Sequence, residues 1–344
     1  MKLKNIWIFN HYATSTFKDR GGRHYWFAKN LISKGYNVTI FCASTMHNSS
    51  DIIETGKNKY RIETIDGIKY IFIKTNLYAG NGKQRIQNMW NFFYGLFGVT
   101  KNVVSKIKKP DIIYASSVHP LTCIAGIFIS KRYNVKCIVE IRDLWPLTLE
   151  DMGKIRKNSI ITKILYMGEH WIYKKADSII FTMEGGKDYI IDKGWDRDID
   201  LGKIYHINNG VDLEKFDYYK NNEIIDDSDL NDDNFKIIYT GAIRNFNNIE
   251  NIINVAKMLY KNKKYSNIKF LIYGDGTDRE RLINICENEK INNILFKGTV
   301  NKKYIPYILS KSRLNLLIYN ENVGVFKYGW SQTNYLNILL QESL

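Results

Sequence analysis

Short apolar runs rich in β-branched residues recur along the chain, and the spacing between most of them leaves room for a helix. Between the first two runs, the segment Tyr25–Ser33 has the 3.6-residue periodicity of a helix, and Gly35 follows it. Alternation of this kind predicts an α/β fold with a parallel sheet covered by helices on both faces. The predicted strands are Ile6–Phe9, Val38–Phe41, Asp111–Ala115, Lys136–Val139, Ser178–Phe181, Lys236–Tyr239, Lys269–Tyr273, Asn293–Phe296 and Leu314–Ile318.

An acidic, polar stretch from Asp217 to Asn234 interrupts this alternation, which then begins again. The interruption predicts two Rossmann-like domains joined by a linker, because domain boundaries fall in polar segments between separate cores. We expect a first domain at residues 1–194, a linker at 195–234 and a second domain at 235–344. A chain of 344 residues, 44% of them hydrophobic, is long enough to bury a sizeable core in each.

The cysteines and the lengths of the apolar runs indicate the cellular compartment in which the protein is expected. Cys42, Cys123, Cys137 and Cys286 are scattered through the strand and helix patterns. This placement favours buried thiols in a reducing compartment over a disulfide framework or a zinc site. No apolar run reaches the ~20 residues of a membrane-spanning helix, and no signal-peptide pattern precedes the first strand. We therefore expect a cytoplasmic protein.

The formal net charge of +15 suggests an anionic partner. Between Lys83 and Lys109, aromatic residues that include Trp90, Phe93 and Phe97 are followed by a run of lysines. Such a segment fits an interfacial helix on an anionic membrane surface. It equally fits an amphipathic helix that covers the sheet, and a lysine-rich composition also arises from an AT-rich genome. No motif of a nucleic-acid-binding fold is present, so we expect no nucleic-acid partner.

Polar residues follow two neighbouring predicted strands. Arg142 and Asp143 come after the run that starts at Lys136, and Pro146 ends regular structure soon afterwards. His119 follows the preceding strand. Ligands of open α/β sheets bind at the carboxyl ends of the strands, so these side chains mark a candidate active-site edge. The alternatives are a surface ion pair for Arg142 and Asp143 and a structural role for His119.

The order of motifs along nearly the whole chain closely resembles bacterial family 4 glycosyltransferases, retaining enzymes of the GT-B type, many of which build capsular or O-antigen polysaccharide. The motifs are Gly21-Gly22, Ser116-Ser117-Val118-His119-Pro120, Arg142-Asp143-Leu144-Trp145-Pro146, Asn209-Gly210-Val211-Asp212, Tyr239-Thr240-Gly241, Gly274-Asp275-Gly276 and Tyr328-Gly329-Trp330-Ser331.

The resemblance implies two Rossmann-like domains that face each other across a cleft. It also implies transfer of a hexose from a nucleoside diphosphate sugar, with uridine diphosphate as the expected carrier. The acceptor would be an undecaprenyl-diphosphate-linked saccharide at the inner face of the plasma membrane. The family works without a metal, so we expect no cofactor. A nucleotide-sugar 2-epimerase shares the fold and is the alternative enzyme.

The chemistry of the transfer assigns roles to these residues. The departing diphosphate gains negative charge, which glycine-rich backbone amides and basic side chains stabilise, while a carboxylate steadies the sugar cation or orients the acceptor. The expected catalytic residues are Asp143 and His119. The expected donor-binding residues are Gly241, Arg244, Gly274, Gly276 and Ser331, and the expected acceptor-binding residues are Gly21, Gly22, Arg23 and Arg142.

The resemblance breaks at the end of the chain. After Thr333 the family pattern continues roughly Lys-Leu-Phe-x-Tyr-x-Ala-x-Gly-Lys-Pro, whereas this chain reads Asn-Tyr-Leu-Asn-Ile-Leu-Leu-Gln-Glu-Ser-Leu from Asn334 to Leu344. A one-base shift in a suitable coding sequence converts the second string into the first. This predicts a frameshift that truncates the second domain and leaves an inactive, poorly soluble remnant.

Overall fold

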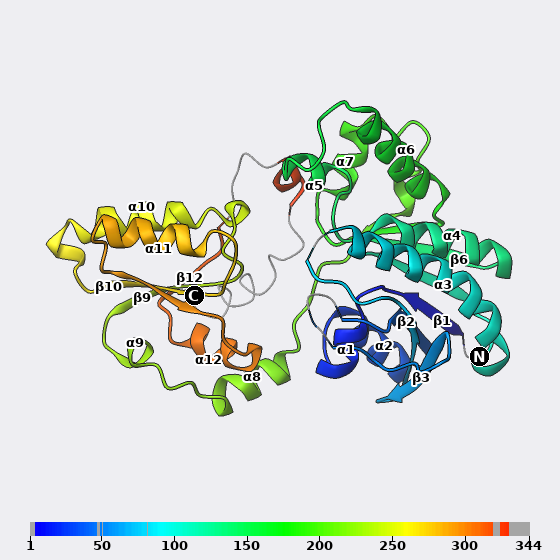
Figure 1. The fold of residues 1–344 in the computed structure, drawn as a ribbon, viewed down its shortest axis with the longest axis horizontal. Helices are drawn as coiled ribbons and strands as arrows, with labels where there is room; N and C mark the ends of the chain where they lie inside the picture. The colour runs from blue at the N-terminus through cyan, green and yellow to red at the C-terminus, as the bar shows by residue number, and fades with distance from the viewer. Residues whose placement is uncertain (1–3, 47–48, 50, 81, 319–323, 330–344) are drawn as a thin grey trace. The chain divides into compact units, whose positions relative to one another are not determined.

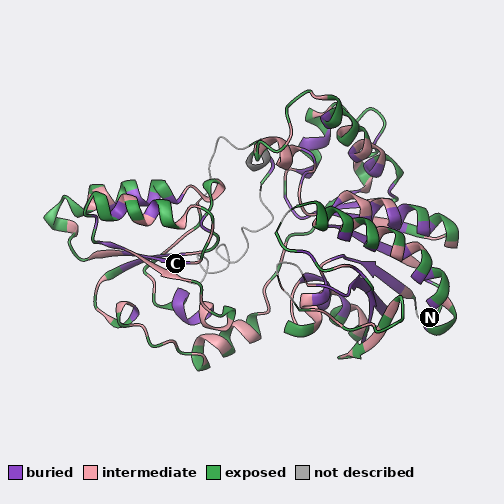
Figure 2. Cartoon of the chain, viewed as in Figure 1, coloured by how far each residue is buried: buried purple, intermediate pink, exposed green. Residues whose placement is uncertain are grey.

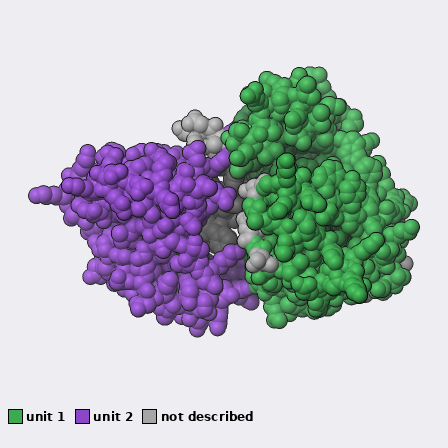
Figure 3. Space-filling model, viewed as in Figure 1, with its two compact units in different colours: residues 1–209, 327–331 green, residues 210–326, 332–344 purple. Residues whose placement is uncertain are grey.

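The structure, a computed structural model, describes residues 4–46, 49, 51–80, 82–318 and 324–329. The chain forms two compact units (Figure 3). Unit 1 contains Met1–Asn209 and Lys327–Ser331, and unit 2 contains Gly210–Phe326 and Gln332–Leu344. In the part of the chain that is described, no helix is both long enough and apolar enough to span a bilayer.

Unit 1 is built on an eight-stranded sheet of order β3-β4-β2-β1-β5-β6-β7-β8 (Figure 1). All neighbouring strands are parallel except β3 and β4. The strands are β1 Asn5–Phe9, β2 Asn37–Ala43, β3 Tyr60–Ile65, β4 Ile68–Ile73, β5 Ile112–Ser117, β6 Lys136–Ile141, β7 Ser178–Phe181 and β8 Ile204–His206. The helices are α1 Thr14–Asp19, α2 Arg23–Ser33, α3 Lys83–Ile107, α4 Pro120–Tyr133, α5 Leu147–Asp151, α6 Ile160–Lys175 and α7 Gly186–Asp192, with the 3₁₀ turn η1 at Leu201–Lys203.

The antiparallel pair β3 and β4 is a hairpin that the sequence pattern did not predict. Its loop is Asp66-Gly67, and both residues have positive φ, at 50° and 78°. A two-residue hairpin loop requires this backbone in a type I′ turn, and an Asp-Gly pair adopts it readily. The hairpin extends the sheet beyond β2 and places β3 at its edge.

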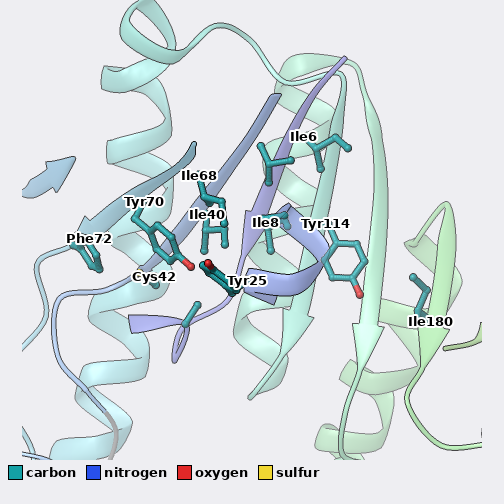
Figure 4. Packing of buried hydrophobic residues seen from close by; sticks show 13 residues of the cluster. Ile6, Ile8, Tyr25, Ile40, Cys42, Ile68, Tyr70, Phe72, Tyr114 and Ile180 are labelled. Carbon is teal, nitrogen blue, oxygen red and sulfur yellow. The ribbon is translucent and has the colours of Figure 1, made fainter. Parts of the chain in front are cut away.

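The sheet of unit 1 buries both faces. On one face, Ile8, Ile40 and Tyr70 pack with Tyr25 and Ala28 of α2 (Figure 4). The opposite face is covered by α3 and α4. Two helix glycines allow the backbones to approach closely there, because a Cβ on Gly95 would lie 2.4 Å from the Ile73 side chain and one on Gly126 would lie 2.5 Å from that of Ala115. Both faces being apolar explains why the strands appear as continuous hydrophobic runs.

A short segment after unit 2 belongs to unit 1. The backbone N–H of Gly185 donates to the carbonyl of Tyr328 over 2.8 Å, and the Tyr328 hydroxyl donates to Asp192 over 2.8 Å. Lys327 forms an ion pair with the same carboxylate. The 3₁₀ turn η5 at Gly324–Tyr328 is thus attached at its end to α7. The chain therefore leaves unit 1 after residue 209 and rejoins it at residue 327.

Unit 2 has a four-stranded parallel sheet of order β11-β10-β9-β12. Ile237, Phe270 and Ile272 of the sheet pack with Ile249 and Ile253 on one face. The strands are β9 Phe235–Thr240, β10 Ile268–Tyr273, β11 Ile294–Gly298 and β12 Leu314–Leu316. The helices are α8 Leu213–Asn222, α9 Ser228–Asn231, α10 Ile249–Tyr260, α11 Arg279–Asn288 and α12 Ile305–Ser310, with 3₁₀ turns η2 Asn245–Asn247, η3 Lys263–Tyr265 and η4 Lys302–Tyr304.

The predicted α/β class is confirmed. The segment predicted as a linker, 195–234, contains more structure than its composition suggested. β8 pairs with β7 and extends the sheet of unit 1, while α8 and α9 belong to unit 2. β8 escaped prediction because three residues are too few to show a period. The prediction of a truncated end concerns residues 334–344, which lie outside the described residues.

Candidate functional site

The strand order of unit 1 reverses direction between β1 and β5. From β1 the chain proceeds to β2 and β4 on one side, and it returns through β5, β6 and β7 on the other. Ligands of open α/β sheets bind at the carboxyl ends of the strands where the order reverses. The residues at that point are Asn10 and His11 after β1 and His119 after β5. Arg142 and Asp143 follow β6, whose end is paired with that of β5.

His119 is almost wholly buried, at 1% exposure, in the position before α4. Its Nε2 atom lies 2.6 Å from Nδ1 of His11. Burial and, to a smaller extent, the nearby positive charge of Arg85 lower the pKa of His119 to about 3, so the ring is neutral at physiological pH. Its other nitrogen, Nδ1, is buried without a hydrogen-bond partner among the described residues.

Asp143 and Arg142 are half-buried and follow β6, the strand that pairs with β5, which precedes His119. Burial raises the pKa of Asp143, while the positive charges of Arg142 and Arg85 oppose that rise. The Asp143 side chain makes no hydrogen bond within the part of the chain that the structure describes, and Nε of Arg142 is likewise unpartnered there. Both side chains therefore retain hydrogen-bonding capacity for a ligand.

Arg85 is a site residue that the sequence analysis missed. It comes from the first turn of α3, and its Nε donates to the Tyr12 hydroxyl over 3.0 Å. Its charge acts on both His119 and Asp143. The sequence offered no signal, because Arg85 lies in the aromatic and basic stretch that fitted an interfacial helix and a helix covering the sheet equally well.

Gly21 and Gly22 lie at the start of α2, as the motif predicted. Gly22 precedes the first helical residue and has φ of 98°, a backbone conformation that only glycine adopts without strain. The loop thus leads directly into a helix N-terminus, where backbone N–H groups are available to an anion.

Arg23 differs from expectation. Instead of facing an open acceptor surface it is buried, at 8% exposure, with Nε 2.5 Å from Oε1 of Glu140. Its terminal nitrogens donate to the backbone carbonyls of Ile207 and Asn208 over 2.8 and 2.6 Å. Because these protein groups use its donors, we assign Arg23 a structural role, joining α2 to β6 and to the segment after β8, in place of the expected acceptor contact.

Glu140, which the sequence suggested was a strand-end charge, is fully buried. Its carboxylate accepts hydrogen bonds from Arg23, from Nε2 of His24 at 2.9 Å, from Tyr114 at 2.6 Å and from Ser116 at 2.6 Å. Burial by itself raises the pKa of Glu140, but His24 and Arg23 outweigh it and hold that pKa well below its usual range. The carboxylate is therefore ionised, and it connects α2 to the carboxyl ends of β5 and β6 next to the candidate site.

In unit 2 the strand order reverses between β9 and β12. Gly241 and Arg244 follow β9 at this point, and both are exposed. The Arg244 side chain makes no hydrogen bond among the described residues. An exposed guanidinium at a switch point suits a diphosphate. The N–H groups of Gly241 and Ile243 donate to the carbonyls of Tyr273 and Asp275, each over 3.0 Å.

Gly274 and Gly276 hold this loop in place. A Cβ on Gly274, whose φ is 139°, would lie 1.8 Å from the carbonyl oxygen of Gly241, and one on Gly276 would lie 2.1 Å from that of Ile243. Close packing of the backbone therefore explains why both positions are glycine. This packing brings the loops after β9 and β10 together. Ser331, the remaining predicted donor contact, lies outside the described residues.

Comparison with protein families gives two matches. The model described as Glycosyltransferase Family 4 matches residues 25–215, and the model described as Glycosyl transferases group 1 matches residues 220–325. The first match alone spans more than half of the chain and contains His119, Arg142 and Asp143. No curated protein sequence matches this chain.

Solved structures show the same fold at low sequence identity. HepE from Anabaena, in complex with UDP and glucose, has a TM-score of 0.57 and 12% identity over 91% of this chain and 73% of that one. The E. coli trehalose-6-phosphate structure bound with UDP-2-fluoro glucose has a TM-score of 0.64 and 10% identity, over 92% and 78%. WaaG, a glycosyltransferase involved in lipopolysaccharide biosynthesis, has a TM-score of 0.55 and 9% identity, over 91% and 75%.

Proposed function

This chain belongs to glycosyltransferase family 4, and from that premise we propose that it transfers a hexose from a UDP-sugar to a lipid-linked saccharide during surface polysaccharide synthesis. The family and the GT-B fold of its structural neighbours establish a nucleotide-sugar glycosyltransferase. The observation that supports the finer proposal is that a neutral imidazole, a guanidinium and a carboxyl group follow two neighbouring strands at the switch point of unit 1.

On the donor side, we expect Arg244 and the backbone around Gly241 to bind the diphosphate. As the glycosidic bond breaks, negative charge develops on this leaving group, and a fixed guanidinium stabilises it without reorganisation. This positive charge takes the place that a divalent cation occupies in other enzymes. We therefore propose that transfer needs no metal and continues in EDTA.

On the acceptor side, we expect Asp143 to orient the attacking hydroxyl and to steady the positive charge on the sugar ring. Burial raises the pKa of its carboxyl, and the positive charges of Arg142 and Arg85 oppose that rise by favouring the ionised form. His119 would accept a hydrogen bond from the sugar through Nδ1. We further propose that the configuration at the transferred carbon is retained, as the family resemblance implies.

The donor assignment is tested by UDP binding to single variants, measured by calorimetry. Arg244→Ala should weaken UDP binding about 10-fold or more, because a hydrogen bond to a charged group contributes roughly 1.5–3 kcal/mol. Arg313→Ala is the matched control. Arg313 is also exposed, but it precedes β12 and so lies at the amino ends of the parallel strands, whereas Arg244 lies at their carboxyl ends. UDP binding should therefore not change in Arg313→Ala. Equal effects of the two substitutions would contradict the donor site.

The catalytic assignment is tested by following UDP release with a lipid-linked saccharide acceptor. Asp143→Ala should lower kcat about 10²- to 10⁴-fold with little change in UDP affinity, since its proposed partners are the acceptor and the transition state. Incubation with UDP-N-acetylglucosamine alone distinguishes the alternative enzyme. A 2-epimerase would form the epimer without any acceptor, which a transferase does not do.

The lipid-linked acceptor requires access to a membrane, and we propose that a face of unit 1 provides it. α4 packs beside both α3 and α6, with the rings of Phe128 and Trp171 5.5 Å apart. Figure 2 shows exposed positions along these helices. We call the exposed apolar residues of these helices the three-helix face: Ile86, Trp90, Tyr94, Phe128, Ile160, Ile161, Ile164, Leu165 and Met167.

The exposed formal charges on the segments that contain the three-helix face are positive, although Asp198 pairs with Lys174 of α6. Segments 83–109 and 120–136 contain lysine and arginine but no carboxylate. In segment 152–175 the one carboxylate is Glu169, which is buried. Apolar side chains surrounded by cations suit the headgroups of an anionic bilayer. α3 also covers the sheet, as the amphipathic-helix interpretation of that segment predicted, and its membrane interpretation stays part of this proposal.

Sedimentation with vesicles tests this surface. We expect binding to phosphatidylglycerol vesicles, weaker binding to phosphatidylcholine vesicles, and release by salt. The triple variant Ile160→Ser, Ile164→Ser and Met167→Ser should lose most binding. Val255→Ser with Met258→Ser, which removes exposed apolar residues from α10 of unit 2, should bind as the unchanged protein does. Undiminished binding of the triple variant would exclude α6 from the docking surface.

A further inference from the structure

Three fully buried polar residues form a line behind the free nitrogen of His119. They are Asn88 of α3, His11 after β1 and His119 after β5, and none is more than 1% exposed. Oδ1 of Asn88 lies 2.7 Å from Nε2 of His11, and Nδ1 of His11 lies 2.6 Å from Nε2 of His119. A line of hydrogen bonds with fixed direction determines which ring nitrogens carry protons.

The orientation of the Asn88 side-chain amide sets the donor-to-acceptor direction of these hydrogen bonds. Its Nδ2 group donates to the Thr45 hydroxyl over 3.0 Å and to the backbone carbonyl of Asn76. A carbonyl only accepts, so the NH₂ end of the amide must lie on that side. The end that faces His11 is therefore the oxygen, and Nε2 of His11 must carry a proton to donate to it.

The proton positions then follow along the line for neutral rings. A neutral imidazole holds one proton, so His11 with its proton on Nε2 has a bare Nδ1. The proton in the 2.6 Å contact must consequently come from Nε2 of His119. With its single proton there, His119 also has a bare Nδ1, which is the buried atom without a partner among the described residues.

The surroundings favour neutral rings. The His11 ring stacks on Phe92, with centroids 4.5 Å apart and planes at 9°, and it also contacts the Tyr12 ring. Arg85, one turn before Asn88 on α3, brings a positive charge close to His119. Burial and a neighbouring cation both disfavour an added proton on an imidazole.

We propose that Asn88 and His11 are positioning residues that hold His119 with Nδ1 bare, as a hydrogen-bond acceptor for a hydroxyl group of the bound sugar. The inference rests on the proposed function for the identity of the ligand, but not for the proton positions. A site with a buried acceptor selects a sugar that has a hydroxyl there. A deoxy analogue leaves the nitrogen unpaired and loses about 10-fold or more in kcat/KM.

The proton positions are measured directly on the full chain labelled with ¹⁵N-histidine. Long-range ¹H–¹⁵N spectra at pH 7 distinguish protonated from bare ring nitrogens. We expect His11 and His119 both to have the proton on Nε2, with signals assigned by loss in His11→Phe and His119→Phe. A proton on Nδ1 of His119, or a doubly protonated ring, would overturn the inference.

The role of His11 is tested by its substitution. His11→Phe keeps a ring against Phe92 but removes both nitrogens, so His119 should become a mixture of the two tautomers. His170→Phe is the control, because His170 lies on α6 and bonds Asp198 instead. If His119 remains in one tautomer in His11→Phe, the positioning role is refuted.

Transfer assays with hydroxyl and deoxy donors complete the test. His11→Phe should reduce the preference for the hydroxyl donor by several-fold, whereas His170→Phe should keep it. An unchanged preference in His11→Phe would refute the link between proton position and selection. Absence of transfer in the unsubstituted protein, with the expected proton positions observed, would instead reject the proposed function and leave the inferred line of hydrogen bonds intact.

Discussion

Replacement of Glu140 by glutamine should strongly destabilise unit 1. The carboxylate accepts four hydrogen bonds within 2.9 Å and is the buried counter-charge of Arg23. Glutamine keeps the size but removes the charge and presents an NH₂ group to donors that need an acceptor. Breaking a buried ion pair from one side costs about 3–5 kcal/mol, which for a unit of this size lowers Tm by roughly 6–20 °C.

Urea unfolding followed by tryptophan fluorescence measures this loss. Tryptophans 7, 26, 90, 145, 171 and 195 all lie in unit 1. Glu63→Gln is the control, because Glu63 pairs with Arg61 at the surface and should cost at most about 0.5 kcal/mol.

A double-mutant cycle then tests the pairing itself. Arg23→Met should cost less in the Glu140→Gln background than alone, since the arginine is already unpaired there. A loss below about 1 kcal/mol for Glu140→Gln, or equal costs of Arg23→Met in both backgrounds, would refute the reasoning. Because the pKa of Glu140 is held low in the folded state, its contribution should persist above the unfolded pKa and disappear only in strong acid.

Three further outcomes are expected. Burial raises the pKa of Glu169 to about 8, so stability should fall by up to ~1.4 kcal/mol per pH unit between ~4.5 and 8, and Glu169→Gln should flatten that slope in urea titrations. Gly274→Ala should unfold at lower urea and lose UDP binding, whereas Gly298→Ala, with positive φ but open space, should show only backbone strain of about 1–2 kcal/mol. Burial raises the pKa of Cys42 and Cys137 to about 12, so native thiols should react slowly with Ellman's reagent at pH 8, and fast labelling before unfolding would contradict their burial.

The strands of both sheets were largely predictable because burial on both faces makes each one a continuous apolar run. β7, at Ser178–Phe181, coincides with its prediction. The hairpin of β3 and β4 was missed although Asp66-Gly67 is a typical turn sequence, because β3 is a partly exposed edge strand without a continuous apolar run. The strand-end rule located His119 and Asp143, and applied to β1 it would also have found His11.

Long-range pairing explains the remaining differences. Arg23 and Glu140 are 117 positions apart, and nothing in either segment shows that they meet. The same holds for Asn88, which sits on α3 in a stretch whose composition suggested only aromatic and basic surface. Contacts of this kind depend on which helix covers which strand, and periodicity along one segment carries no information about that choice.

The return of the chain to unit 1 at residue 327 has a consequence for limited proteolysis. The Gly210–Phe326 part of unit 2 lies between two sequence segments of unit 1, which are joined by the Gly185–Tyr328 hydrogen bond and the Lys327–Asp192 ion pair. A single cut near residue 210 therefore yields two fragments that still share the α7 attachment. They should co-elute in native gel filtration and separate only in denaturant. Liberation of unit 2 as an independent piece requires a second cut before residue 327.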